Sequence, residues 1–227
     1  MAKEKGAQCK GCASAANGYL IAYNGIQTVG WTYLLFQVFS HYLFTPSVPL
    51  YDQVKWTVIL FQNAAVLEVV HAATGLVRAN PVLTAFQVAS RVIVVCGILM
   101  ATEAPRHSIG LALALLAWSV TEIIRYSMYT LSLLGQAPYF LTWLRYSTFT
   151  ILYPIGITGE LLCIYAAQKE VGENGLYSIK MPNQFNVIFN YQHVLVFLML
   201  LYIPLFPQLF MHMVSQRKKV LGGQKKE

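Results

Sequence analysis

Apolar stretches recur along the 227-residue chain and are separated by short polar or proline-containing segments. A membrane-spanning helix needs about 20 mainly apolar residues. Six stretches meet this requirement, at 19–39, 56–77, 82–100, 108–130, within 140–168, and at 185–210. The pattern predicts an all-α polytopic membrane protein, a bundle of six transmembrane helices.

The composition supports insertion into a membrane. Hydrophobic residues make up 56% of the chain and charged residues only 11%, whereas a soluble domain carries roughly 25% charged residues. Residues 1–18 are polar and lack the central apolar stretch of a cleavable signal, so we expect the first span to direct insertion. We find neither an internal repeat nor a separate soluble domain.

The distribution of basic residues predicts the orientation. An even number of spans places both termini on one side, where the tails and Arg78 carry nine Lys and Arg against four on the other side. Cytosolic segments are enriched in Lys and Arg, so both termini should be cytosolic. Basic tails beside spans fit anionic lipid better than nucleic acid. The chain then divides into a polar cytosolic tail (1–18), a membrane domain (19–210) and a basic cytosolic tail (211–227).

Polar and ionisable side chains lie inside four successive predicted spans. Hydrocarbon does not tolerate such groups facing outward, and their helical spacing puts those of each span on one face. We therefore expect inward polar faces on these four helices. The residues concerned are Glu68 and His71, Gln87 and Arg91, Trp118, Glu122, Arg125 and Tyr126, and finally Arg145, Tyr153 and Glu160.

Several roles are open for these residues. A lone charge at mid-span costs about 3 kcal/mol, so Glu68 and Arg91 need partners and could pair with one another, as a structural ion pair or as support for an active site. Glu122 and Arg125 could form a local i, i+3 pair with a structural role. His71 is better explained as a packed core histidine than as a proton relay.

The fifth predicted span contains the most suggestive arrangement, in the stretch WLRYSTFTILYPIGITGE (143–160). Tyr153 and Glu160 are seven residues apart, which places them about 20° apart on one helix face and about 10.5 Å apart along the axis. One proline and two glycines lie between them and would bend the helix or allow another helix close to it. We interpret Tyr153 and Glu160 as an acid/base pair. Arg125 and Arg145 could instead reach lipid headgroups from near the helix ends.

Cysteine usage does not indicate metal or phosphatase chemistry. Cys9 and Cys12 form one CxxC without a second Cys or His pair, and Cys96 and Cys163 lie in apolar runs. No cysteine precedes a glycine-rich, arginine-terminated phosphate loop. Because motifs for a flavin, a nicotinamide or a metal are also missing, we expect neither a cofactor nor a metal.

Long blocks of the chain resemble the 3-hydroxyacyl-CoA dehydratase family, also called protein tyrosine phosphatase-like, and especially its plant members of the PASTICCINO2 type. The blocks are AAVLEVVHAATGLVR, VASRVIVVCGIL, WSVTEIIRYSMY, WLRYSTFTILYPIGITGE and YSIKMPN. The resemblance implies a six-span enzyme of the endoplasmic reticulum membrane with cytosolic termini, so that 19–210 would be the catalytic domain. It places the family's catalytic residues on Tyr153 and Glu160, and its supporting or substrate-binding positions on Glu68, Gln87, Arg91, Arg145 and Gly156.

The implied reaction is the third step of very-long-chain fatty acid elongation, in which (3R)-3-hydroxyacyl-CoA loses water to give trans-2-enoyl-CoA. Glu160 could remove the C2 proton while Tyr153 protonates the departing C3 hydroxyl, and the reverse assignment is also open. The acyl chain would need an apolar tunnel, and CoA a basic cytosolic mouth that includes Arg145. Implied partners are acyl-CoA, membrane lipid and the other elongase subunits, namely the condensing enzyme, the ketoacyl reductase and the enoyl reductase.

Two other classes of protein compete with this reading. A catalytically silent membrane scaffold for elongase or signalling partners would tolerate the loss of Tyr153 and Glu160. A small-solute transporter would use the same inward charges, but the chain has no inverted repeat and no matched pair of broken helices.

Overall fold

The computed structural model describes residues 2–179 and 188–223, and the side chains of 15–179 and 188–221. The regular secondary structure of the described residues is helical, apart from one isolated antiparallel bridge between Ile179 and Phe189. The predicted all-α class is therefore confirmed. The elements are α1 (Ala2–Phe44), α2 (Leu50–Ala64), α3 (Val66–Ala73), α4 (Pro81–Val92), the π-helical η1 (Ile93–Leu99), the 3-10 turn η2 (Ala104–His107), α5 (Ile109–Leu133), α6 (Tyr139–Asn174) and α7 (Tyr191–Gly223).

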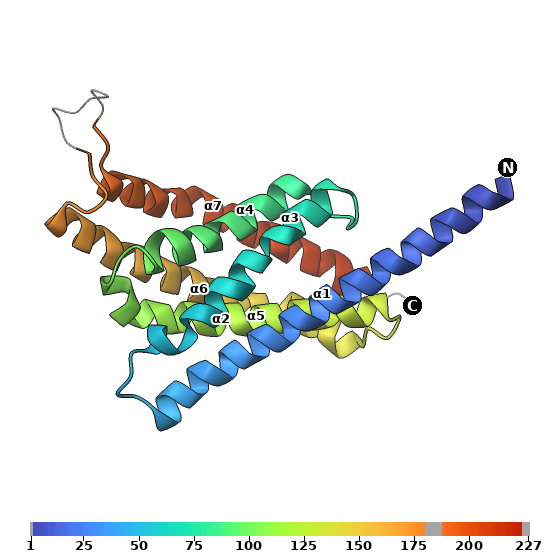
Figure 1. Ribbon diagram of the computed structural model, residues 1–227, viewed down its shortest axis with the longest axis horizontal. Coiled ribbons are helices and arrows are strands. Elements are labelled where there is room, and N and C mark those ends of the chain that lie inside the picture. Colours follow the sequence, from blue (N-terminus) through green and yellow to red (C-terminus); the bar gives the residue numbers. More distant parts are fainter. Residues whose placement is uncertain (1, 180–187, 224–227) are drawn as a thin grey trace.

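The helices form a bundle in which successive passes of the chain run in opposite directions along one axis (Figure 1). The α3–α4 and α5–α6 connections lie at the same end as the start of α1 and the end of α7. The α1–α2 and η1–α5 connections lie at the opposite end, with the carboxyl end of α6 and the amino end of α7. The amino end of α1 and the carboxyl end of α7 thus lie at one end of the bundle, as expected for an even number of passes.

Within the described ranges, five helical segments are long and apolar enough to cross a membrane. Each overlaps one of the second to sixth predicted spans, although residues 185–187 of the sixth prediction lie outside the described residues. The five segments are Leu50–Ala73, Pro81–Leu99, Ile109–Leu133, Tyr139–Asn174 and Tyr191–Leu221.

The first predicted span, 19–39, is helical but is not among these five segments. It carries polar residues that turn into the bundle, including the buried Asn24 and Gln27. Its outward face is apolar, with Ile26 63% and Val29 70% exposed. Polar residues on the inner face lower the mean hydropathy of α1 without making its outer surface polar. The predicted boundary between Gly18 and Tyr19 falls inside this helix.

Helix α5 lies at the centre of the bundle and packs against both α1 and α6. Its backbone touches that of α6, because a Cβ atom built on Gly159 would lie 2.5 Å from the backbone nitrogen of Ala114. A Cβ on Gly110 of α5 would likewise lie 2.7 Å from the Gly159 carbonyl oxygen. One reason for the glycine in ITGE is therefore helix packing, which holds Glu160 against α5.

Local capping sets several helix boundaries. The Asn80 side chain accepts hydrogen bonds from two backbone N–H groups in the first turn of α4, and Pro81 follows at a position where its missing N–H costs nothing. The Ser108 hydroxyl accepts one from Gly110 at the start of α5. Helix α6 runs through Pro154 and ends at Asn174, followed by the capping residue Gly175, whose φ of +64° favours glycine.

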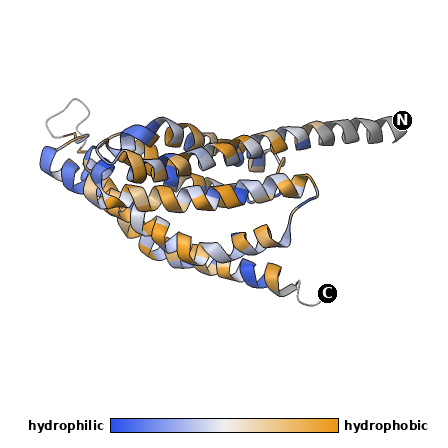
Figure 2. Ribbon diagram, turned by 90° about the horizontal axis from the view of Figure 1, so that it is seen from below, coloured by the Kyte–Doolittle hydropathy of each residue, from blue (hydrophilic) through white to orange (hydrophobic). Residues whose placement is uncertain are grey.

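The residues along the helices are mainly hydrophobic (Figure 2), and many large apolar side chains are exposed on the outside of the bundle. Helix α7 is the most exposed rod, since only 6% of its span is buried, and Phe197, Leu200 and Ile203 face outward. It packs mainly on α6. An apolar exterior around buried polar groups is expected of a helical membrane protein.

Candidate active site

Glu160 is buried where α5, α6 and α7 meet. Its side chain is held from two sides: the indole N–H of Trp118 on α5 donates to Oε1 across 2.8 Å, and the Tyr202 hydroxyl on α7 donates to Oε2 across 2.6 Å. Only 7% of the residue is exposed. Each carboxylate oxygen therefore has one fixed donor, and this orients the group relative to three helices.

Tyr153 faces α7 from two turns earlier on α6. Its ring stacks on Phe206, with centroids 5.3 Å apart and planes inclined by 8°, and lies 6.2 Å from the ring of Phe210. Among the described residues its hydroxyl has no hydrogen-bond partner. Tyr202, Phe206 and Phe210 recur every four residues, so one face of α7 runs along both Glu160 and Tyr153. Tyr153 and Glu160 share a face of α6, and their catalytic role stays a prediction.

A second buried cluster joins α3, α4 and α5. Glu122 on α5 forms ion pairs with Arg91 of α4 and with Arg125 one turn on. Arg125 also meets both carboxylate oxygens of Glu68 on α3, at 2.5 and 2.9 Å, and Tyr126 donates a hydrogen bond to Glu68. Two arginines and two glutamates thus neutralise one another across three helices.

The predicted pairing of Glu68 with Arg91 is wrong. Helix α5 carries an acidic and a basic side chain on one face. Glu122 therefore forms an ion pair with Arg91, and Arg125 forms one with Glu68. The local pair between Glu122 and Arg125 is confirmed, but each of these residues has a second partner on another helix. Because Arg125 is engaged by two carboxylates, it does not need to reach lipid headgroups.

The remaining predicted positions lie apart from this cluster. Arg145, in the second turn of α6, donates to the Tyr129 hydroxyl at 2.9 Å and stacks over that ring. The amino end of α6 lies at the same end of the bundle as the start of α1. Gln87 is exposed, so its predicted inward orientation is wrong. Gly156 is buried and approaches Ala117 of α5.

His71 is a packed histidine, as the sequence favoured. It is buried, and one ring nitrogen lies 2.9 Å from the Tyr19 hydroxyl of α1. The rings of Tyr19 and Tyr23 meet it edge to face. Its contacts therefore join α3 to α1.

Tyr202 is a site residue that the sequence reasoning missed. It lies in YIPLFPQLF, within an apolar run where one tyrosine does not stand out. The available signal was the spacing of Tyr202, Phe206 and Phe210, which puts three aromatic rings on one face of a span. Trp118 was placed on the polar stripe of α5, but no role was assigned to it.

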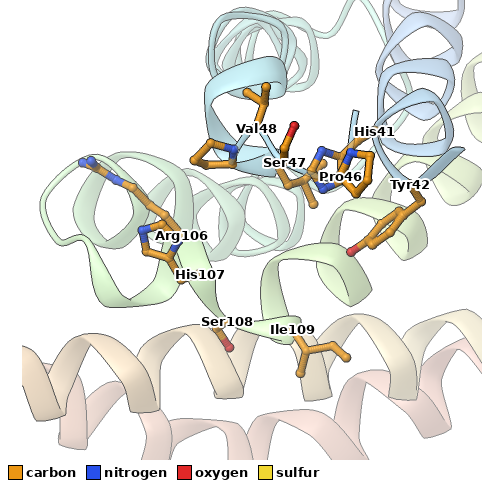
Figure 3. Close-up of a pocket in the computed structure, with 11 residues that line it drawn as sticks. His41, Tyr42, Pro46, Ser47, Val48, Arg106, His107, Ser108 and Ile109 are labelled. Carbon is orange, nitrogen blue, oxygen red and sulfur yellow. The ribbon is translucent and has the colours of Figure 1, made fainter. Parts of the chain in front are cut away.

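A cavity lies elsewhere, beside the α1–α2 connection (Figure 3), which is at the opposite end of the bundle from the start of α1. It has a volume of about 430 Å³ and is lined by the α1–α2 connection and the residues around η2, including His41, Arg106 and His107. Neither Tyr153 nor Glu160 lines it, so it is not the predicted acyl tunnel. In the part of the chain that the structure describes, no group of three or more His, Cys, Asp or Glu is arranged to hold a metal.

A comparison with protein-family models matches the family that the sequence resembles. The family model described as "Protein tyrosine phosphatase-like protein, PTPLA" matches residues 62–223, which contain both Tyr153 and Glu160. No solved structure matches the chain.

The curated relatives cover nearly the whole chain. "Very-long-chain (3R)-3-hydroxyacyl-CoA dehydratase 2" of Mus musculus is 45% identical over 94% of this chain and 84% of its own. "Very-long-chain (3R)-3-hydroxyacyl-CoA dehydratase hpo-8" of Caenorhabditis elegans is 47% identical over 92% of this chain and 97% of its own. "Very-long-chain (3R)-3-hydroxyacyl-CoA dehydratase PASTICCINO 2" of Arabidopsis thaliana is 37% identical over 92% of this chain and 95% of its own. The resemblance found in the sequence is confirmed: the chain belongs to the protein tyrosine phosphatase-like (PTPLA) family.

Proposed function

We propose that this protein dehydrates very-long-chain (3R)-3-hydroxyacyl-CoA to trans-2-enoyl-CoA, the third step of fatty acid elongation. The support comes from relatives that are 45% and 47% identical over most of the chain and carry the name of this activity. A buried carboxyl group and a phenol on one face of a membrane helix supply the acid and the base that an elimination of water needs.

In the proposed mechanism Glu160 is the base and Tyr153 is the acid. Glu160 removes the C2 proton, which the thioester acidifies, and the electron pair of the C–H bond forms the C2–C3 double bond. The C3–O bond breaks, and the hydroxyl leaves as water with the proton of Tyr153. Proton transfer from Glu160 to the tyrosinate, directly or through water, restores both groups.

The observation that carries this assignment is the environment of Glu160. Two donors, Trp118 and Tyr202, point at its two oxygens. These two hydrogen bonds fix the orientation of the carboxyl group, and each oxygen of the ionised group retains a lone pair that can accept a proton. The Tyr153 hydroxyl, which has no partner among the described residues, is free to meet the substrate.

The substrate lies along the seam between α6 and α7 in this proposal. Tyr153 and Glu160 are seven residues apart and both face α7, whereas C2 and C3 of the substrate are bonded neighbours. The phenol must therefore move closer to Glu160 when the substrate binds, and Phe206 of α7, which stacks on the ring of Tyr153, must move with it. Helix α7 is suited to such movement because it packs mainly on α6 and is exposed elsewhere.

We also propose six spans, with both termini on the cytosolic side of the endoplasmic reticulum membrane. The apolar outer face of α1, with Ile26 and Val29 exposed, supports α1 as a span in addition to the five segments described above, the first one along the chain. The excess of Lys and Arg at the end of the bundle that holds the chain termini supports the orientation. Arg145 lies near that end, where it would bind the CoA phosphates, and elongase subunits would be the partners within the membrane.

The test is enoyl-CoA formation by the purified protein in detergent, with a C18 or longer (3R)-3-hydroxyacyl-CoA. The dehydratase proposal expects trans-2-enoyl-CoA to form until the hydroxyacyl-CoA and the enoyl-CoA reach equilibrium. The scaffold alternative expects none, and it expects Tyr153→Phe and Glu160→Gln to rescue a deletion strain as well as the unaltered protein does.

A further inference from the structure

The phenol that is hydrogen-bonded to Glu160 is that of Tyr202 and not that of Tyr153. The Tyr202 hydroxyl lies 2.6 Å from Oε2 of Glu160, and this contact joins α7 to α6. On the other side, Trp118 joins the carboxylate to α5. A side chain with several rotatable bonds is thereby held by one donor on each oxygen.

The direction of this hydrogen bond decides what Tyr202 can do. Its hydroxyl hydrogen is directed at the carboxylate, so it stabilises the charge of Glu160 and is not free for a substrate oxygen. Each carboxylate oxygen retains another lone pair, because an ionised carboxyl group offers about four acceptor sites. Glu160 can therefore stay bound to Trp118 and Tyr202 while it accepts a proton.

The position of Tyr202 also connects Glu160 with the surroundings of Tyr153. Tyr202 and Phe206 are one turn apart on α7, and Phe206 stacks on Tyr153. The same face of α7 thus holds the carboxylate in place at one turn and the phenol ring at the next.

We propose that Tyr202 is a positioning residue for the dehydration, which acts by fixing the orientation and charge of Glu160. This inference rests on the proposed function, in which Glu160 is the base. Because Tyr202 acts through Glu160 and not on the substrate, its loss should lower kcat and leave KM almost unchanged.

The experiment compares Tyr202→Phe with Tyr191→Phe in the purified full-length protein. Tyr191 is a matched control: it is on α7 as well, and its hydroxyl also donates at 2.6 Å, but to the carbonyl oxygen of Gly97. Each variant removes one hydroxyl and one hydrogen bond from the same helix. We expect Tyr202→Phe to lower kcat about 10- to 100-fold, with KM within about 2-fold of wild type, as expected for one hydrogen bond to a charged group.

The control separates positioning from stability. Tyr191→Phe should keep wild-type kcat, and the melting temperatures of the two variants in detergent should be similar. Wild-type kcat in Tyr202→Phe would overturn the inference, as would an equal loss of kcat in both variants. A raised KM at unchanged kcat would overturn it too, because it would make Tyr202 a substrate contact.

Two further variants make the outcome decisive. Trp118→Phe removes the donor to the other oxygen from a different helix, so if Tyr202→Phe does not fold, a kcat loss at constant KM in Trp118→Phe supports the inference and a wild-type kcat overturns it. Glu160→Gln separates the role of Glu160 as the base from the role of Tyr202. An active Glu160→Gln overturns the proposed function, whereas an inactive Glu160→Gln together with a fully active Tyr202→Phe overturns only the role of Tyr202.

Discussion

The indole nitrogen of Trp118 donates a hydrogen bond to Oε1 of Glu160 across 2.8 Å, which ties a carboxyl group inside one membrane-spanning helix to the neighbouring helix. Neither residue is exposed to the surroundings of the bundle. A carboxylate in a membrane is costly unless it is partnered, and such groups usually mark function. Here the carboxylate has two neutral donors and no direct ion pair among the described residues, unlike Glu68 and Glu122.

The ion network between α3, α4 and α5 should be essential for stability. Arg125→Ala leaves Glu68 without its bidentate partner, and removing one member of a buried ion pair costs about 3–5 kcal/mol. We expect a strongly lowered melting temperature or a loss of folded protein. Lys55→Ala, which breaks an exposed pair with Asp52 at 3.6 Å, is the control and should cost less than about 1 kcal/mol. Similar melting temperatures for the two variants would show that the network does not hold the helices together.

The contact between α5 and α6 should not tolerate a side chain at Gly159. A Cβ there would lie 2.5 Å from a backbone nitrogen of α5, so Gly159→Ala must push the two helices apart. We expect a lower melting temperature and, because Glu160 would move away from Trp118, a lower kcat. Gly25→Ala is the matched control on α1, where nothing lies within 4 Å of the added atom. A Gly159→Ala protein as stable and active as Gly25→Ala would contradict this packing.

The aromatic ring of Phe206 should contribute to catalysis because it contacts Tyr153. Phe206→Ala removes the ring that stacks on Tyr153, and such a pair contributes about 0.5–1.5 kcal/mol. We expect kcat/KM to fall by up to about 10-fold. Phe197→Ala, an exposed position on the same helix, should have no effect on kcat/KM. Equal kinetics of both variants would remove the α6–α7 seam from the substrate site.

Arg145 should contribute to binding of the CoA part of the substrate. Arg145→Ala removes a guanidinium near the end of the bundle that holds the termini, so we expect a higher KM for hydroxyacyl-CoA at nearly constant kcat. Lys169→Ala is the control, because Lys169 is an exposed cation on the same helix near its other end. An unchanged KM in Arg145→Ala with intact expression would show that this arginine is outside the CoA site.

Periodicity alone predicted the helical bundle and the shared face of Tyr153 and Glu160, because both depend only on helical geometry. The partners of Arg91 and Glu68 could not be predicted in this way. A sequence shows that each residue faces inward, but not which of two oppositely charged residues on α5 lies opposite it. Gln87 was misplaced for a related reason, since a polar residue one turn before an inward arginine can still face outward.

Tyr202 was missed because its partner Glu160 is 42 residues earlier in the chain. Only the packing of α7 along α6 brings the two together. In α1 the inward residues Asn24 and Gln27 lower the mean hydropathy of the helix. Its apolar outer face is therefore recognised only from the packed bundle.

The most direct test of the account is the rate of enoyl-CoA formation by purified Glu160→Gln, compared with wild type and with Glu173→Gln. The control makes the same substitution at an exposed position on the same helix. General acid–base catalysis contributes about 100- to 10,000-fold, so Glu160→Gln should lose at least about 100-fold in kcat, and Glu173→Gln should remain at the wild-type rate. A folded Glu160→Gln protein with wild-type kcat would contradict the assignment of Glu160 as the base.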